Sequence, residues 1–472
     1  MAKNLEKLKT NQNPTINFNP TKEVLKMHSW YRKIMVVVFI VTLMAISTGG
    51  SFANAAPPQK IKIGVIGPMK FQSGQHSWWG AEMAADEINA AGGITVGKKK
   101  YSLELAKADS NEQMSITDAV TAMGRLITVN KVNFVIGGYL TEPVLAMQDV
   151  AADHKVIFIG GAGAPDICGR LAKNYDRYKY YFRALHPNSA ILGKLNMIVM
   201  EVGAAKIRTE LGISKPKVAL VLTKTKVTDA IAESMSATLP KLGMELVGVW
   251  RTSPNAPDYT TELTAIRASG AQIIGTFLWG PTGVVFSRQW GELRIPAIPI
   301  GFNVDACEKA YWERTMGMCE YETLYSTFGR VSITAKSIPF WDKYVKKTGE
   351  YPSSQSGTYA SVYIIKEAIE RAGTLETEAV LLALENTDYT GPSGRYRFFP
   401  RDHMWPHDLV FGPNDFIGIG TQWRNGELVI IWPNGEPALG DEGWKGVRFK
   451  ETKELALPPW MIKYWKDKTV KN

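Results

Sequence analysis

The chain has 472 residues, of which 45% are apolar and 21% are charged, and it contains three cysteines. This composition supports folded domains with substantial cores and excludes both a largely disordered chain and a disulfide-dense miniprotein. The 55 Lys and Arg residues outnumber the 45 Asp and Glu residues, which gives a formal net charge of +10.

The first 55 residues predict an export signal. Two basic residues, 32–33, precede an uncharged apolar run at 34–46, and the sequence Ala-Asn-Ala ending at Ala55 follows. This order of a basic segment, a short apolar core and small residues is typical of a secretory signal peptide. The run is shorter than the roughly 20 residues of a membrane-spanning helix, which disfavours an N-terminal anchor. We expect translation to start at Met27, cleavage to follow Ala55, and the exported protein to have no stable membrane insertion.

The same segment explains half of the net charge. It holds seven basic and two acidic residues, so a net charge of +5 remains for the rest of the chain. The short basic runs that remain, such as Lys98–Lys100, have no interleaved aromatic residues and are typical of solvated surfaces. We therefore predict no nucleic-acid partner.

Strands and helices alternate along the rest of the chain. Strands are predicted at 61–66, 101–106, 132–136 and 156–159, and later at 217–222, 245–250 and 271–277. Helices are predicted at 80–90, 115–128, 143–152, 189–211, 229–242, 260–269 and 283–292, and later at 338–348, 359–372 and 376–385. Such alternation predicts α/β lobes with parallel sheets and helices on both faces, and a break near 182–187 separates two of them.

Motifs for catalysis are weak. Gly92–Lys98 has the spacing of a phosphate-binding loop, but Lys99 follows where Ser or Thr is required, and the segment lies between a helix and a strand in the wrong order. His403 and His407 each have an aspartate beside them, but Pro406 prevents one helix from presenting both imidazoles. A loop metal site in a secreted hydrolase stays open as a minor alternative; we predict no metal, no cofactor and no enzyme.

Three cysteines would lie in an oxidising compartment after export. Cys307 and Cys319 are close in the sequence and could form a disulfide, which would leave Cys168 as a free thiol. The alternative is that all three are small buried residues.

Several segments, in this order, resemble the type I periplasmic binding proteins of branched-chain amino-acid-type ABC transporters, the Leu/Ile/Val-binding-like family. These segments are Ile61–Pro68, Gly80–Ile94 with its Asn-x-x-Gly-Gly-Ile ending, Asn133–Gly138, Val156–Gly160, Tyr351-Pro352, Tyr359–Gly373, Gly420–Trp423 and Trp432-Pro433. The resemblance covers nearly all of residues 60–435. It implies two Rossmann-like lobes joined by three crossover segments, expected near 183–188, 320–335 and 395–410.

The implied domains follow from these crossings. Lobe 1 would comprise 56–184 and 336–405, lobe 2 would comprise 185–335 and 406–435, and 436–472 would be a C-terminal extension. The resemblance implies a periplasmic protein that closes by a hinge motion on a small-molecule ligand and delivers it to ABC transporter permease subunits. The ligand would be a small carboxylate, amino-acid-like or amide-type solute. A ligand-sensing subunit for a membrane receptor is the alternative, because the fold is shared.

The resemblance places ligand-binding groups at the carboxyl ends of strands, where helix N-termini favour an anion. In the first lobe, Thr141 matches a family Ser or Thr, and Ala162 and Ala164 match residues after the fourth strand. The family commonly has Thr where Ala164 stands, so one hydroxyl is missing, while the Ala162 carbonyl and the Ala164 N–H remain. Further candidates are a loop hydroxyl and aromatic residues that form either a stacking wall or packing beneath the lobe edge: Ser73, Trp78, Trp79 and Tyr139.

The second lobe departs further from the family pattern. Val227 aligns with a family Tyr, and Asn303 aligns with the acidic residue that pairs the ligand ammonium. Asp305 would share a strand face with Asn303 and could replace that acid. Without it, a buried ammonium would be unpaired and costly, which weakens the case for a free α-amino acid. Trp279 is the aromatic candidate in this lobe.

Overall fold

A computed structural model describes residues 59–279 and 282–469, together with Trp30 and Met35. Internal contacts divide the chain into residues 1–58 and residues 59–472, and the fold described below is that of the second unit. Apart from Trp30 and Met35, the predicted signal peptide therefore lies outside the described residues. Within the described part of the chain, no helix is long and apolar enough to cross a membrane.

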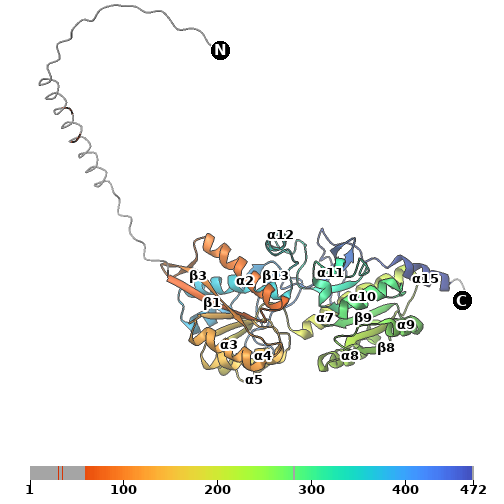
Figure 1. Ribbon diagram of the computed structural model, residues 1–472, viewed down its shortest axis with the longest axis horizontal. Coiled ribbons are helices and arrows are strands. Elements are labelled where there is room, and N and C mark those ends of the chain that lie inside the picture. Colours follow the sequence, from red (N-terminus) through yellow and green to blue (C-terminus); the bar gives the residue numbers. More distant parts are fainter. Residues whose placement is uncertain (1–29, 31–34, 36–58, 280–281, 470–472) are drawn as a thin grey trace, which may run out of the picture. The chain divides into compact units, whose positions relative to one another are not determined.

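The first lobe is built on a six-stranded sheet in the order β2-β3-β1-β4-β5-β6 (Figure 1). Its strands run parallel, except that β2 pairs antiparallel with β3. Its elements are β1 (Gln59–Gly67), α2 (Gln72–Ala90), β2 (Ile94–Val96), β3 (Lys99–Asp109), α3 (Ile116–Thr128), β4 (Phe134–Gly137), α4 (Thr141–Asp153), β5 (Ile157–Gly160), α5 (Asp166–Lys173), α6 (Tyr175–Tyr178) and β6 (Tyr181–Arg183), with the later α12 (Ser337–Thr348), η3 (Ser354–Gly357), α13 (Thr358–Ala372) and α14 (Thr377–Glu385). Neighbouring strand residues belong to different clusters, Ile136 to one face and Val135 to the other, so both faces of the sheet are covered.

The second lobe has a seven-stranded sheet in the order β15-β14-β11-β10-β9-β7-β8, in which β14 and β15 run antiparallel to their neighbours. Its elements are α7 (Ser189–Leu211), β7 (Lys217–Thr223), α8 (Lys226–Thr238), η1 (Leu239–Leu242), β8 (Glu245–Thr252), α9 (Thr260–Ser269), β9 (Ile273–Leu278), α10 (Thr282–Glu292), β10 (Ile298–Asn303), η2 (Asp305–Cys307), α11 (Tyr311–Arg314), β11 (Thr323–Ser326), β14 (Ile419–Arg424), β15 (Glu427–Trp432), η4 (Glu442–Trp444) and α15 (Pro459–Thr469). Ile273 and Ile274 again pack into clusters on opposite faces.

Three passages connect the lobes, from β6 to α7, from β11 to α12, and from the small hairpin of β12 (Tyr389–Gly391) and β13 (Gly394–Tyr396) to β14. The predicted α/β fold of two lobes with three crossings is confirmed. The third crossing lies later than predicted, because Leu409 and Phe416 still pack in the core of lobe 1, whereas Ile417 packs in the core of lobe 2.

Helix α2 begins eight residues earlier than predicted. The segment from Gln72 was expected to be a loop because it contains Ser73 and Gly74. A Cβ atom at Gly74 would lie 2.3 Å from the Pro68 carbonyl oxygen, so the missing side chain lets the helix start against the preceding turn. Residues expected at a loop are therefore on a helix.

The C-terminal extension packs against lobe 2. Trp444, Met461 and Trp465 belong to one of the core clusters of that lobe. The indole N–H groups of Trp460 and Trp465 donate to the carbonyls of Ile295 and Pro296, at 3.0 and 2.7 Å. The extension therefore completes the second lobe.

Candidate functional site

The loop after β5 is fixed by a buried arginine. Arg183, at the end of β6, has a fully buried side chain whose two Nη atoms donate to the carbonyls of Ala162 and of Ala164, the latter at 2.6 Å. Its Nε lies 3.1 Å from Oδ1 of Asp408, which is also fully buried. Burial disfavours the charge, but Asp408, Cys168 and Tyr181 together outweigh burial, and the pKa of Arg183 is raised. The Ala162 carbonyl, expected to face a ligand, is already an acceptor for Arg183.

Asp408 ties this loop to the first crossing. It precedes the third crossing and belongs to lobe 1, and Nδ2 of Asn188 on the first crossing donates to its Oδ2 at 2.9 Å. Asn188 also caps α7, because its Oδ1 accepts from the N–H groups of Ala190 and Ile191. The loop at 162–164 and the start of lobe 2 thus share one buried polar network.

The two histidines considered for a metal site have other roles. His407 is buried and stacks on Phe182, with its Nδ1 3.0 Å from the Tyr181 carbonyl and its Nε2 3.1 Å from Glu385. His403 stacks on Phe399. Among the described residues, no three His, Cys, Asp or Glu side chains form a group that could hold a metal.

Tyr139 and Thr141 lie where the sequence predicted them, at the carboxyl end of β4. Both are half-buried, and Thr141 is the first residue of α4. Burial raises the pKa of Tyr139, and negative charge at Glu112 in lobe 1 and at Cys307 in lobe 2 adds to the rise. Tyr139 therefore lies close to groups of both lobes.

The other aromatic candidates of lobe 1 are used within that lobe. The Trp78 indole N–H donates to Glu82 at 3.2 Å, and Lys107 lies over its ring. Trp79 contacts the edge of His76 and packs on the lobe core. Both tryptophans are half-buried against the core of lobe 1, and a stacking wall made by them stays a prediction.

Lobe 2 has a ladder of three aromatic rings, of which Tyr325 is buried in the lobe core and Trp279 and Phe302 are half-buried against it. Trp279 follows β9, Phe302 lies on β10 and Tyr325 on β11, with ring centroids 5.7 and 5.3 Å apart along the series. The three strands are neighbours, and the rings lie at their carboxyl ends. The backbone N–H of Trp279 donates to Thr223 Oγ1 at 3.0 Å, which fixes the outer end of the ladder.

Asn303 is part of an internal network of lobe 2. It is fully buried, and its Nδ2 donates to the Tyr311 hydroxyl at 2.8 Å and to Glu322 at 3.0 Å. Ser287 and Tyr311 also donate to Glu322, at 2.7 and 3.0 Å. The amide of Asn303 therefore binds protein groups, and burial raises the pKa of Glu322 to about 7.

Asp305 remains available as an acidic group. It begins the short helix η2, is 9% exposed, and has a single ion pair, with Arg314 at 3.6 Å. Its Oδ2 has no hydrogen-bond partner among the described residues, and burial raises its pKa. The side chain of Val227 is outside the described residues, and its backbone lies in the first turn of α8.

The cysteines are free thiols, so the disulfide considered for Cys307 and Cys319 is not formed. Both pack in or against one apolar cluster of lobe 2, and Cys168 is buried in lobe 1. The alternative prediction, of small residues packed in the protein, describes Cys168 and Cys319; Cys307 is partly exposed.

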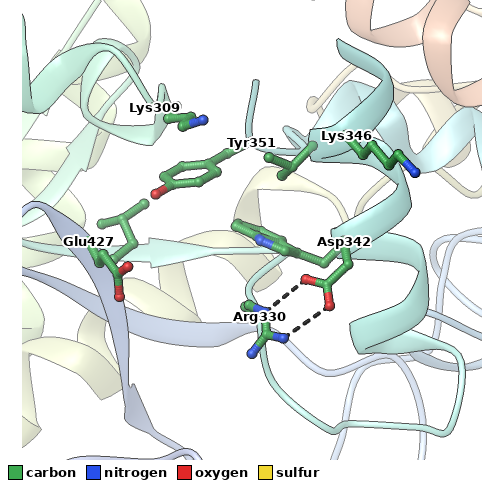
Figure 2. A pocket seen from close by; sticks show the side chains of 9 residues that line it. Lys309, Arg330, Asp342, Lys346, Tyr351 and Glu427 are labelled. Carbon is green, nitrogen blue, oxygen red and sulfur yellow. Dashed lines mark hydrogen bonds and ion pairs between the residues drawn. The ribbon is translucent and has the colours of Figure 1, made fainter. Parts of the chain in front are cut away.

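A pocket of about 420 Å³ lies between α12 and the β14–β15 hairpin (Figure 2). Its lining residues are Lys309, Arg330, Trp341, Asp342, Val345, Lys346, Tyr351, Glu427 and Leu428. Arg330 and Asp342 pair with each other through two hydrogen bonds of 2.8 and 3.0 Å. None of the predicted ligand residues lines this pocket, so it is separate from the strand ends.

Sequence reasoning missed three contributors to the strand-end site: Arg183, Phe302 and Glu112. Arg183 was not predicted as a site residue, because β6 was not recognised as a strand. Glu112 was missed because the loop after β3 was not counted among the strand ends that could hold a ligand. Phe302 lay within a segment considered only for its polar residues, although the alternation along β10 places it opposite Asn303.

Two α/β lobes with polar and aromatic groups at their strand ends define a solute-binding fold. The profile of the periplasmic binding protein family matches residues 60–413, so the chain belongs to that family. It is 24% identical over 409 residues to the Leu/Ile/Val-binding protein homolog 7 of Brucella suis, covering 83% of this chain and 96% of the relative.

Solved structures agree in fold. A branched-chain amino acid ABC transporter periplasmic ligand-binding protein from Burkholderia xenovorans superposes with a TM-score of 0.62 at 17% identity, covering 82% of this chain and 97% of that one. A branched-chain amino acid transporter substrate-binding protein from Streptococcus pneumoniae, in complex with isoleucine, gives a TM-score of 0.60 at 20% identity, covering 78% and 98%.

Proposed function

We propose that the protein is the extracytoplasmic solute-binding component of an ABC importer. It would capture a small amino-acid-like, carboxylate or amide-type solute between the strand ends of its lobes and deliver it to a membrane permease. The observation that carries this proposal is that each lobe has candidate binding groups at the carboxyl ends of its strands. These groups are Tyr139 and Thr141 in lobe 1 and the ladder from Trp279 to Tyr325 in lobe 2. Parallel sheets bind ligands at such edges.

The hinge supports the same proposal. Arg183, Asp408 and Asn188 connect the loop at 162–164 to the first crossing, so a solute that contacts this loop would act on a segment that must bend during closure. Export through the predicted signal peptide would place the protein in the periplasm, where it would meet the permease.

A ligand screen tests the proposal. Amino acids, aromatic acids, short amides and urea would be added to the purified protein, and binding would be detected by thermal shift and calorimetry. Binding to the folded state alone adds RT ln(1 + [L]/Kd) to the free energy of unfolding, so the midpoint of unfolding rises with the logarithm of the ligand concentration once that concentration exceeds Kd. We expect one class to bind with 1:1 stoichiometry; if no small molecule raises the midpoint, the proposed function is wrong.

A further inference from the structure

Several buried polar atoms at the strand ends have no hydrogen-bond partner among the described residues. In lobe 1 these are the hydroxyls of Ser73 and Ser110 and both carboxylate oxygens of Glu112. In lobe 2 they are Oδ1 of Asn303 and Oδ2 of Asp305. Most buried polar atoms in folded proteins have partners, so such atoms grouped at one place indicate a missing ligand or solvent molecule.

The backbone places Glu112 at the centre of the lobe 1 edge. The N–H of Ser110 donates to the Gly67 carbonyl at 2.9 Å, so the loop after β3 crosses the end of β1. Strand β1 lies between β3 and β4, and Glu112 therefore reaches the loop after β4. Burial raises the pKa of Glu112 to about 7, although the backbone N–H groups of Tyr139 and Leu140 and the Ser110 hydroxyl favour its charged form.

Most of the atoms without a hydrogen-bond partner are hydrogen-bond acceptors. An ionised carboxylate and an amide oxygen only accept hydrogen bonds, whereas a hydroxyl can donate or accept. Glu112 is only 3% exposed and has no ion pair among the described residues, while Arg183 is already committed to Asp408 and to two carbonyls. A group that supplies hydrogen-bond donors and positive charge would satisfy this edge.

We propose that the solute presents a cationic nitrogen to Glu112 of lobe 1. This rests on the proposed solute-binding function and names the class of solute: a small organic ammonium compound, with or without a carboxylate. The nitrogen donates to the Glu112 carboxylate, and the apolar part of the solute lies toward Trp279, Phe302 and Tyr325. Aromatic rings tolerate a neighbouring cation, because their faces carry negative potential.

A series of four probes with one isobutyl tail tests this proposal. Leucine carries both head groups, 3-methylbutylamine only the ammonium, 4-methylpentanoate only the carboxylate, and 4-methylpentanamide a neutral amide. Each is titrated calorimetrically into the purified protein and into the Glu112→Gln variant, which has nearly the same shape without the charge. Glu320→Gln is the matched control, since Glu320 is a half-buried acid on lobe 2 that accepts from the Asn425 N–H at 2.8 Å.

We expect leucine or the amine to bind, and Glu112→Gln to weaken that binding by about 10-fold to 100-fold, the range for a charged hydrogen bond. The variant should fold, because it removes an unpaired buried charge, and Glu320→Gln should bind like the native protein. The proposal is overturned if neither ammonium probe binds, or if Glu112→Gln binds them with native affinity. Binding of the amide or the carboxylate alone would overturn it and leave the solute-binding function intact. No binding by any solute, here or in the wider screen, would overturn both.

Discussion

The two strand edges of the proposed site differ in how they use their polar groups. Lobe 1 leaves Glu112 buried without an ion pair among the described residues, and Arg183 fixes its loop at 162–164. In lobe 2, Asn303 donates a hydrogen bond to Glu322 inside the lobe, and a row of aromatic rings lies at the strand ends. The proposed site therefore assigns the head group of the solute to lobe 1 and its apolar body to lobe 2.

Removal of the Arg183 side chain should cause the largest loss of stability in lobe 1. The variant Arg183→Ala leaves Asp408 charged and buried, which costs about 3–5 kcal/mol of unfolding free energy. Chemical denaturation measures the loss. Arg330→Ala is the matched control: its pair with Asp342 is exposed, and such pairs contribute about 1 kcal/mol or less. Equal, small losses in the two variants would show that the buried pair does not hold lobe 1 together.

The buried carboxyls predict a pH dependence in each lobe. Burial raises the pKa of both Glu112 and Glu322 to about 7. The folded state therefore holds these protons more tightly than the unfolded state, and the free energy of unfolding should fall as pH rises from about 4.5 to 7. Each group contributes at most roughly 3 kcal/mol to that fall.

Denaturation at several pH values, with Glu112→Gln and Glu322→Gln, separates the two contributions. Each variant should flatten the slope of stability against pH within this window. A saturating ammonium ligand should reduce the contribution of Glu112 to this slope, because a bound cation favours the charged form of its carboxyl group. The contribution of Glu322 to the slope should not change. A slope that neither variant changes would contradict the assignment of these pKa values.

The sequence predicted the architecture well and the site only in part. Strand alternation and turn residues mark the two lobes, because buried parallel strands need apolar residues on both faces. The roles of Trp78 and Asn303 could not be predicted, because they depend on where α2 starts and on which side chains surround the end of β10. Arg183 and Asp408 are 225 positions apart in the chain, and only the folded crossings bring them together.

The aromatic ladder of lobe 2 predicts a moderate effect on binding. Trp279→Ala should weaken binding of the best isobutyl probe by about 10-fold, as expected for loss of an aromatic contact and its buried area. Calorimetric titration measures the change. Trp78→Ala is the control, because its indole pairs with Glu82 and Lys107 within lobe 1. If Trp78→Ala weakens binding as much as Trp279→Ala does, aromatic residues of lobe 1 also contact the apolar part of the solute, and the assignment of that contact to lobe 2 is wrong.

The last prediction tests whether the Thr141 hydroxyl of lobe 1 also contacts the solute. Thr141→Val keeps the shape of the side chain at the start of α4 and removes its hydroxyl, and a hydrogen bond to a charged group contributes about 1.5 kcal/mol at the low end of its range. We expect leucine to bind roughly tenfold more weakly, while 3-methylbutylamine is unaffected, because the N-terminus of α4 favours the carboxylate that only leucine carries. Thr121→Val on α3, whose hydroxyl bonds the Thr117 carbonyl, is the control for the loss of a helix hydroxyl. Equal weakening of both probes would place the ammonium group at Thr141, and the proposed contacts of the ammonium with Glu112 and of the carboxylate with α4 would then be wrong.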